Sequence, residues 1–191
     1  MPKQTLDRET ILETALQITR ANGFDAVNAR SVAAATGHSV QPIYSYFQNM
    51  EDLKVAVYQK AMTFYKNFIS FRADGSRLME SMGFANIAFA REETHLFRLL
   101  FMTKLEGYDS FQTLFNRMGD SKAAQGLSEE WGIPMENAQE LYIMLIVFTH
   151  GIASMLAADA VQIADEEIHE LMKRAYKAFC SFEQQRNNEN R

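Results

Sequence analysis

The chain has 191 residues, of which 47% are hydrophobic, and its 19 basic and 24 acidic side chains give a formal net charge of −5 at pH 7. This length accommodates one or two domains with an apolar core, and the composition is typical of a folded globular protein. A strongly basic nucleic-acid carrier and a low-complexity disordered chain are therefore excluded.

Cysteine usage and the N-terminal residues bear on the compartment. Cys180 is the single cysteine of the sequence, so an intrachain disulfide is impossible. No basic, apolar secretory segment precedes the first predicted helix. We therefore expect a cytoplasmic protein and interpret Cys180 as a buried structural thiol, with a redox sensor as the alternative.

Two short helices separated by Gly37 are predicted between residues 24 and 53. Asn28 is a suitable N-cap, and Val32 and Ala33 then give a helix with a small-residue face. Gly37 suits the position after a helix that favours a positive φ, so the first helix is expected to end there. These features predict a helix-turn-helix, a motif whose second helix enters the major groove of DNA.

The second helix of this motif is expected to begin at Ser39 as its N-cap and to tolerate Pro42 in its first turn. Ile43 and Phe47 lie four residues apart and are expected to face the core, and Tyr44 is a further candidate for inward packing. Gln41, whose amide suits an adenine edge, is then expected to face outward with Ser45 and Tyr46. The residues that we predict to bind or position DNA are Asn28, Arg30, Ser39, Gln41, Pro42, Tyr44, Ser45, Tyr46 and Lys54.

Charge in this region is balanced, because residues 1–54 hold five basic and six acidic side chains. Phosphate contacts are therefore expected from segregated cations, namely Lys3, Arg30 and Lys54. The helix N-termini add backbone N–H donors that carry no formal charge.

The order of motifs over about residues 9–54 resembles the N-terminal domain of TetR-family transcriptional regulators. The matching runs are Ile11-Leu12-Glu13-Thr14-Ala15-Leu16, Asn22-Gly23-Phe24, Arg30-Ser31-Val32-Ala33 with Gly37, Ile43-Tyr44-Ser45-Tyr46-Phe47 and Glu51-Asp52-Leu53. The family commonly has lysines near the positions of Val40 and Met50, and this chain has neither. The resemblance implies a homodimer that regulates transcription and responds to a small molecule.

Beyond Leu53 the apolar spacing predicts longer helices. One amphipathic helix is expected to continue to about residue 71, before Asp74-Gly75 interrupts it. Further helices are predicted at residues 78–89, 96–102, 110–118, 141–158 and 165–182. Residues 119–134 hold three glycines and are predicted to form a loop, and the polar tail from Gln184 is expected to fray. No period-2 strand pattern occurs, so an all-α fold is predicted.

Residues 141–158 are apolar on almost every side. A membrane span is disfavoured because His150 lies near the centre and no Trp, Lys or Arg anchors flank the segment. Coverage by a second subunit is the preferred explanation, with two helices from each protomer in a four-helix interface. The predicted dimer-interface residues are Gly151, Ser154, Met155, Ala158, Leu171, Met172 and Phe179.

Aromatic and methionine side chains concentrate in the middle of the chain, which has 14 Phe and 11 Met in all. Such side chains line adaptable apolar pockets, although plain core packing explains any single one equally well. The residues predicted to bind an effector are Phe64, Phe68, Phe97, Phe101, Met102, Tyr142 and Phe148.

Enzymatic motifs are not found: the sequence has no nucleophile elbow, no phosphate-binding glycine loop and no metal-ligand spacing, so no cofactor or metal is expected. The sequence predicts a helix-turn-helix domain at residues 1–48 and an effector-binding and dimerisation domain at 49–191. The predicted function is a repressor that an apolar or amphipathic effector releases from a palindromic operator. The alternative is a protein-interaction module that carries a lipid-like ligand and binds no DNA, for which the two missing lysines are the only support.

Overall fold

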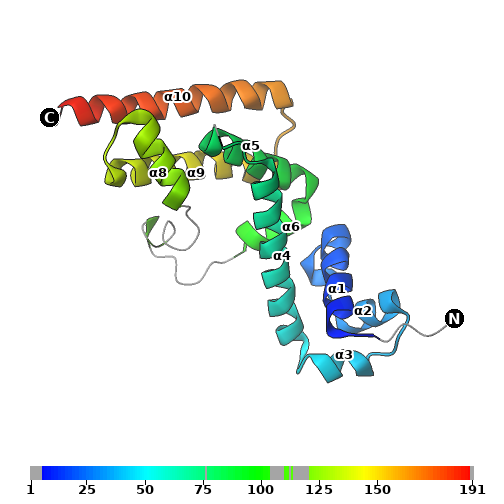
Figure 1. The fold of residues 1–191 in the computed structure, drawn as a ribbon. Helices are drawn as coiled ribbons and strands as arrows, with labels where there is room; N and C mark the ends of the chain where they lie inside the picture. The colour runs from blue at the N-terminus through cyan, green and yellow to red at the C-terminus, as the bar shows by residue number, and fades with distance from the viewer. Residues whose placement is uncertain (1–5, 76, 104–109, 112, 114–120, 190–191) are drawn as a thin grey trace. The chain divides into compact units, whose positions relative to one another are not determined.

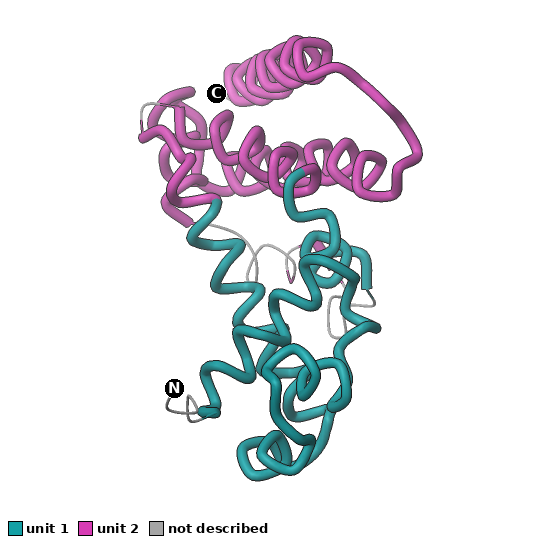
Figure 2. The backbone as a smooth tube through the Cα atoms, turned by 90° about the vertical axis from the view of Figure 1, so that its right-hand side faces the viewer, with its two compact units in different colours: residues 1–68, 92–103 teal, residues 69–91, 104–191 magenta. Residues whose placement is uncertain are grey.

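The computed structural model describes residues 6–75, 77–103, 110–111, 113 and 121–189. All regular elements in these ranges are helices, as the sequence predicts (Figure 1). The chain divides into two compact units, which are described separately below. Unit 1 comprises residues 1–68 and 92–103, and unit 2 comprises residues 69–91 and 104–191 (Figure 2).

Unit 1 contains the helix-turn-helix and the helices that support it. Its elements are α1 (Arg8–Asn22), the 3₁₀ turn η1 (Phe24–Ala26), α2 (Ala29–Thr36), α3 (Gln41–Tyr46), most of α4 (Met50–Arg72) and α6 (Thr94–Phe101). Asp7 caps α1 by accepting a hydrogen bond from the Thr10 N–H at 2.7 Å. Apolar side chains from all of these α-helices are buried, and the largest of them belong to Ile11, Ile43, Phe47, Leu53, Leu96, Phe97 and Leu100.

Unit 2 is built from α5 (Leu78–Glu92), α8 (Ser121–Trp131), α9 (Met135–Ala157) and α10 (Asp165–Glu189). Its core cluster joins α8 and α9 to α10 through Leu127, Leu141, Tyr142, Leu145 and Cys180. Gly83 lets α5 lie close to its neighbours, because a Cβ at this position would meet the Met172 Cε at 2.9 Å and the Thr149 Oγ1 at 3.5 Å.

The long helices predicted from apolar spacing are confirmed. The first ends at Arg72, just before Asp74-Gly75, because its Asn49 cap and apolar repeat are followed by residues that break a helix. α9 begins earlier than expected, directly after Pro134, where a proline preceding the first turn starts the helix.

Two expectations for unit 2 are wrong. Residues 121–131 form α8 and not a loop, because Ala123, Ala124 and Leu127 share a buried face that compensates for Gly126 within the helix. The tail does not fray at Gln184, since α10 continues to Glu189 and buries Glu183 and Asn187. Most of the predicted helix at 110–118 lies outside the described residues, although the Ser110 Oγ accepts a hydrogen bond from the Thr113 N–H at 3.1 Å.

α9 is long and apolar enough, by length and composition alone, to cross a membrane. It nevertheless supplies Ala138, Leu141, Tyr142 and Leu145 to the core cluster of unit 2. A central helix of a folded domain has the same hydropathy as a membrane span, so the packing of α9 explains its composition.

Candidate nucleic-acid interface

The turn between α2 and α3 is set by local backbone chemistry. The Asn28 Oδ1 accepts hydrogen bonds from the N–H groups of Arg30 and Ser31 at 3.1 and 3.0 Å, and the Ser31 Oγ accepts one from the Asn28 N–H. This capping box fixes the start of α2. Gly37 ends the helix with φ 70°, a left-handed conformation that a side chain would strain. Both predictions for this turn are confirmed.

α3 is anchored by two side chains that the sequence assigns to the core. Ile43 and Phe47 are each 1% exposed, and the guanidinium of Arg8 lies 4.8 Å from the centre of the Phe47 ring. Gln41, Ser45 and Tyr46 are exposed, as expected. The short helix therefore presents a mixed polar and aromatic face to solvent.

Two details of this helix were predicted wrongly. The N-cap is Val40 and not Ser39, because Pro42 occupies the first turn and the chain enters the helix one residue later than expected. Tyr44 does not pack inward, since 49% of its surface is exposed. Its register, one residue after the buried Ile43, places it on the edge of the outward face.

The remaining predicted DNA residues have different roles. Arg30 is exposed on the first turn of α2, and its contact with a phosphate stays a prediction. Asn28 uses its side chain as the cap of α2, so it positions the motif. Lys54 is half-buried with its Nζ 5.5 Å from the centre of the Phe24 ring, so its stem packs within unit 1. Pro42 is half-buried in the first turn of α3, and Ser39 is exposed in the turn before it.

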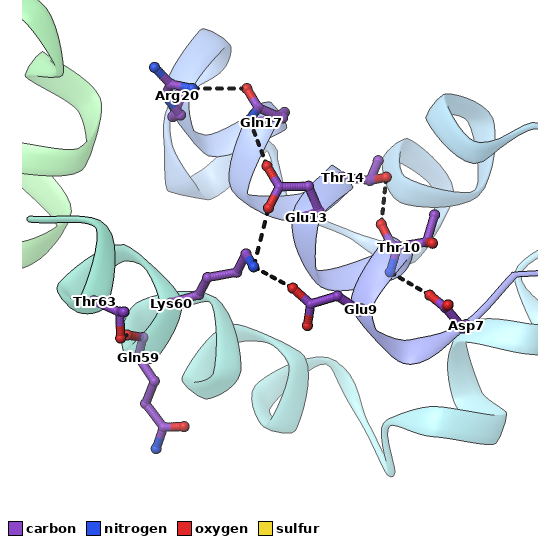
Figure 3. A network of polar contacts seen from close by, with 10 residues as sticks. All are labelled: Asp7, Glu9, Thr10, Glu13, Thr14, Gln17, Arg20, Gln59, Lys60 and Thr63. Carbon is purple, nitrogen blue, oxygen red and sulfur yellow. Dashed lines mark hydrogen bonds and ion pairs between the residues drawn. The ribbon is translucent and has the colours of Figure 1, made fainter. Parts of the chain in front are cut away.

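A polar network ties α1 to α4 (Figure 3). The ammonium of Lys60 on α4 pairs with Glu9 and, at 3.2 Å, with Glu13 of α1. Glu13 also accepts a hydrogen bond from Gln17 at 2.8 Å, and this bond together with Lys60 lowers the pKa of the Glu13 carboxyl. α1 packs against α2 and α3 of the motif. The Lys60 ion pairs therefore hold α1 to α4, the helix that follows the motif.

A second tie joins α1 to the segment before α6. The Arg20 Nε donates to the Glu93 Oε2 at 2.8 Å, and a second guanidinium nitrogen pairs with the other carboxylate oxygen. The Arg20 guanidinium also lies 5.0 Å from the centre of the Phe64 ring of α4. Spacing along the sequence gives no signal for this pair, because 73 residues separate its members.

The predicted effector residues are distributed over both units. In unit 1, Phe97 is fully buried and its ring centre lies 5.1 Å from that of Phe101, whereas Met102 is 43% exposed. Phe64 and Phe68 are half-buried in the same unit. In unit 2, Tyr142 belongs to the core cluster, and the half-buried Phe148 ring contacts Phe179 with 5.8 Å between centres. A role in effector binding stays a prediction for these residues.

The predicted interface residues of α9 and α10 are mostly accessible. Gly151, Met155, Ala158 and Leu171 are exposed, and Ser154 and Phe179 are half-buried. Met172 differs, because it is only 6% exposed and packs against α5 within its own protomer. The face of α10 that carries Leu171 also exposes Phe182, and Leu171, Ala175, Ala178 and Phe182 follow helical spacing.

The other polar groups considered in the sequence have no catalytic arrangement within the described residues. Cys180 is buried, and desolvation raises the pKa of its thiol to about 12, so it is a packing residue in this core. His150 is half-buried on α9, and desolvation lowers its pKa. No group of three His, Cys, Asp or Glu in the described ranges is arranged to hold a metal ion.

The sequence comparisons agree with this geometry. Residues 11–57 match the family model of bacterial regulatory proteins of the tetR family. The chain matches no curated protein. The matched segment covers the capped α2, the left-handed turn at Gly37, the exposed α3 and the start of α4. Regulators of this family are not enzymes, and the match supports DNA binding over an interaction module that binds no DNA. The chain is a DNA-binding transcriptional regulator whose N-terminal domain is that of the TetR family.

Proposed function

We propose that this regulator is a cytoplasmic homodimeric repressor that binds a palindromic operator and leaves it when a small apolar or amphipathic molecule binds. The observation that carries the proposal is the exposed face of α3, supported from below by Ile43 and Phe47. A twofold dimer presents two such helices about one turn of DNA apart, roughly 34 Å. In this proposal residues 1–48 form the operator-binding domain, and residues 49–191 form the domain for dimerisation and effector binding.

The exposed apolar side chains of α9 and α10 support the dimer. Val147 and Met155 on α9 are 46% and 43% exposed, and Leu171 and Phe182 on α10 are 43% and 58% exposed. Gly151 and Ala158 leave room on α9 for a close helix–helix approach. Long helices with this pattern need an apolar partner surface, and a second copy of the chain provides one by symmetry.

The polar ties of unit 1 suggest how effector binding reaches the DNA-binding helices. α4 follows α3 after three residues, and Lys60 holds it to α1. Arg20 links α1 to Glu93 at the start of α6. A shift of α4 or α6 is therefore transmitted to α1 and, through packing, to α3. An effector changes operator affinity only by its preference for one arrangement, which is typically about 1–3 kcal/mol.

Operator binding is tested by selection of genomic DNA fragments with the purified full chain at two salt concentrations. We expect one palindrome to be enriched and its affinity to fall as salt rises. Tyr46→Ala is expected to abolish this enrichment while the melting temperature and the dimer mass stay unchanged, because the side chain is exposed. Enrichment of a sequence without twofold symmetry would contradict the dimeric operator complex.

Effector binding is tested with the fluorescent probe 1-anilinonaphthalene-8-sulfonate, which reports apolar cavities. Phe101→Ala should weaken probe binding while the dimer stays intact, because Phe101 packs against Phe97 and Tyr65 among the central aromatic residues. Phe71→Ala is the matched control, since 90% of the Phe71 surface is exposed. Equal probe affinity for both variants would assign Phe101 to plain core packing.

A further inference from the structure

Val40 occupies an unusual position at the start of α3. It is the N-cap of the helix, and no side chain makes a capping hydrogen bond there. Ser, Thr, Asn and Asp are strongly preferred at this position, and a valine is among the poorest choices. The helix is instead started by the Ile43 N–H, which donates to the Val40 carbonyl at 3.1 Å, and by Pro42. The valine side chain, 39% exposed, therefore serves no capping function.

The geometry of α3 places this side chain beside the residues that face DNA. Val40 and Tyr44 are four residues apart and share one flank of the helix, whereas Gln41 and Ser45 lie at the centre of the exposed face. Ile43 lies on the opposite side and is buried. The N-terminal residues of a recognition helix come nearest to base edges, and Val40 and Gln41 both lie at this end of α3.

The chemistry of valine limits what it can recognise in the major groove. Its side chain neither donates nor accepts a hydrogen bond, so phosphates and the polar edges of guanine, adenine and cytosine offer it no favourable partner. The C5 methyl group of thymine is the apolar feature that a base pair presents in this groove. We propose that Val40 is a specificity-determining residue that contacts a thymine methyl group in each operator half-site.

The small number of unpaired cations in the described part of unit 1 increases the contribution of groove contacts to the binding free energy. Arg30 is exposed on α2, and its guanidinium has no hydrogen-bond or ion-pair partner within the described residues. Four other cations of unit 1 are engaged within it, namely Arg8 with Phe47, Arg20 with Glu93, Lys54 with Phe24 and Lys60 with Glu9 and Glu13, whereas Lys66 is exposed on α4. With fewer cations available to phosphates, a larger share of the binding free energy comes from base edges.

The inference rests on the proposed operator binding, and deoxyuridine tests the two separately because it differs from thymine only by the methyl group. Each thymine of the selected operator is replaced in turn, in both half-sites, and full-chain binding is measured. We expect wild-type affinity to fall about fourfold per half-site at one symmetric position, as for the loss of one buried methyl group. The other positions should show little change.

Val40→Ala shortens the side chain but keeps its Cβ, so the variant is expected to discriminate thymine from deoxyuridine less than the wild type does. Val55→Ala is the matched control, because Val55 is also an exposed valine, 49% accessible, but lies on α4. It should retain the wild-type preference for thymine. Both side chains are exposed, so unchanged melting temperatures will show that the variants fold.

The outcomes separate the inference from the function on which it rests. A wild-type protein that binds the operator but ignores every thymine methyl group overturns the role of Val40, as does a Val40→Ala variant that keeps the full preference. If no operator is enriched from genomic DNA, operator binding itself fails, and the role of Val40 fails with it.

Discussion

Two groups of exposed apolar side chains differ in kind, one at α3 of unit 1 and one on α9 and α10 of unit 2. At α3, the N-cap Val40 together with Tyr44 and Tyr46 alternates with Gln41 and Ser45 along a helix of six residues. On α9 and α10, the exposed apolar residues repeat along helices of 23 and 25 residues. A short mixed face matches base edges, which combine polar groups with methyl groups, whereas a long apolar face needs another protein surface. Exposure alone therefore does not identify the partner, but length and polar content do.

The largest expected effect is the loss of stability when a buried side chain beneath α3 is removed, compared with removal of an exposed side chain of α3. Phe47→Ala removes a buried ring and should lower the free energy of unfolding by about 3–5 kcal/mol, as measured by urea denaturation. Tyr46→Ala, one residue earlier but exposed, should change it by less than about 0.5 kcal/mol and still lose operator binding. Similar stability losses in the two variants would mean that the outward face of α3 also carries the fold.

The next effect tests the surface of α9 and α10. Leu171→Lys places a charge on the exposed apolar face of α10 and should weaken the dimer by about 2–3 kcal/mol, because the ammonium is desolvated in the interface. Sedimentation equilibrium measures the dissociation constant. Val55→Lys makes the same change at an exposed valine of α4 and should leave the dimer intact. An unchanged dimer in Leu171→Lys would place the interface elsewhere.

A smaller effect, on the salt dependence of operator affinity, tests whether Arg30 contacts a phosphate while α3 contacts the bases. Arg30→Ala should reduce the slope of log affinity against log salt concentration by about 0.9 per protomer, since one released counterion is lost from each half-site. Lys66→Ala, which removes an exposed cation from α4, is the control and should keep the wild-type slope. A slope that Arg30→Ala does not alter would remove Arg30 from the set of DNA contacts.

The smallest expected effect is the difference in coupling energy between two ion pairs, one in unit 1 and one in unit 2. Glu93 is 10% exposed in its pair with Arg20, whereas both members of the Arg186–Glu140 pair, between α10 and α9, are at least 37% exposed. A double-mutant cycle on unfolding should give about 1–1.5 kcal/mol for the first pair and less than about 0.5 kcal/mol for the second. Equal coupling energies would show that burial of Glu93 adds nothing to the tie.

Much of the candidate site could be predicted because its signals are local. The capping box at Asn28 and the positive φ of Gly37 depend on residues only a few positions apart, and both were found in the sequence. The start of α3 was misplaced by one residue because Ser39 is a good cap by type, while Pro42 decided the register. The side chain of Tyr44 could not be oriented until that register was known.

The helical class, the helix-turn-helix and the long apolar helices could all be predicted from the amino-acid sequence, because periodicity, caps and breakers act over one or two turns of chain. The tertiary structure alone decided that residues 121–131 form a helix, that Glu183 and Asn187 are buried, and that Arg20 pairs with Glu93. Glu183, Asn187 and Arg20 meet partners 46, 55 and 73 positions away, and α8 is buried against α9 and Cys180 of α10. Burial against a distant partner can outweigh a weak local propensity, so no local pattern reports it.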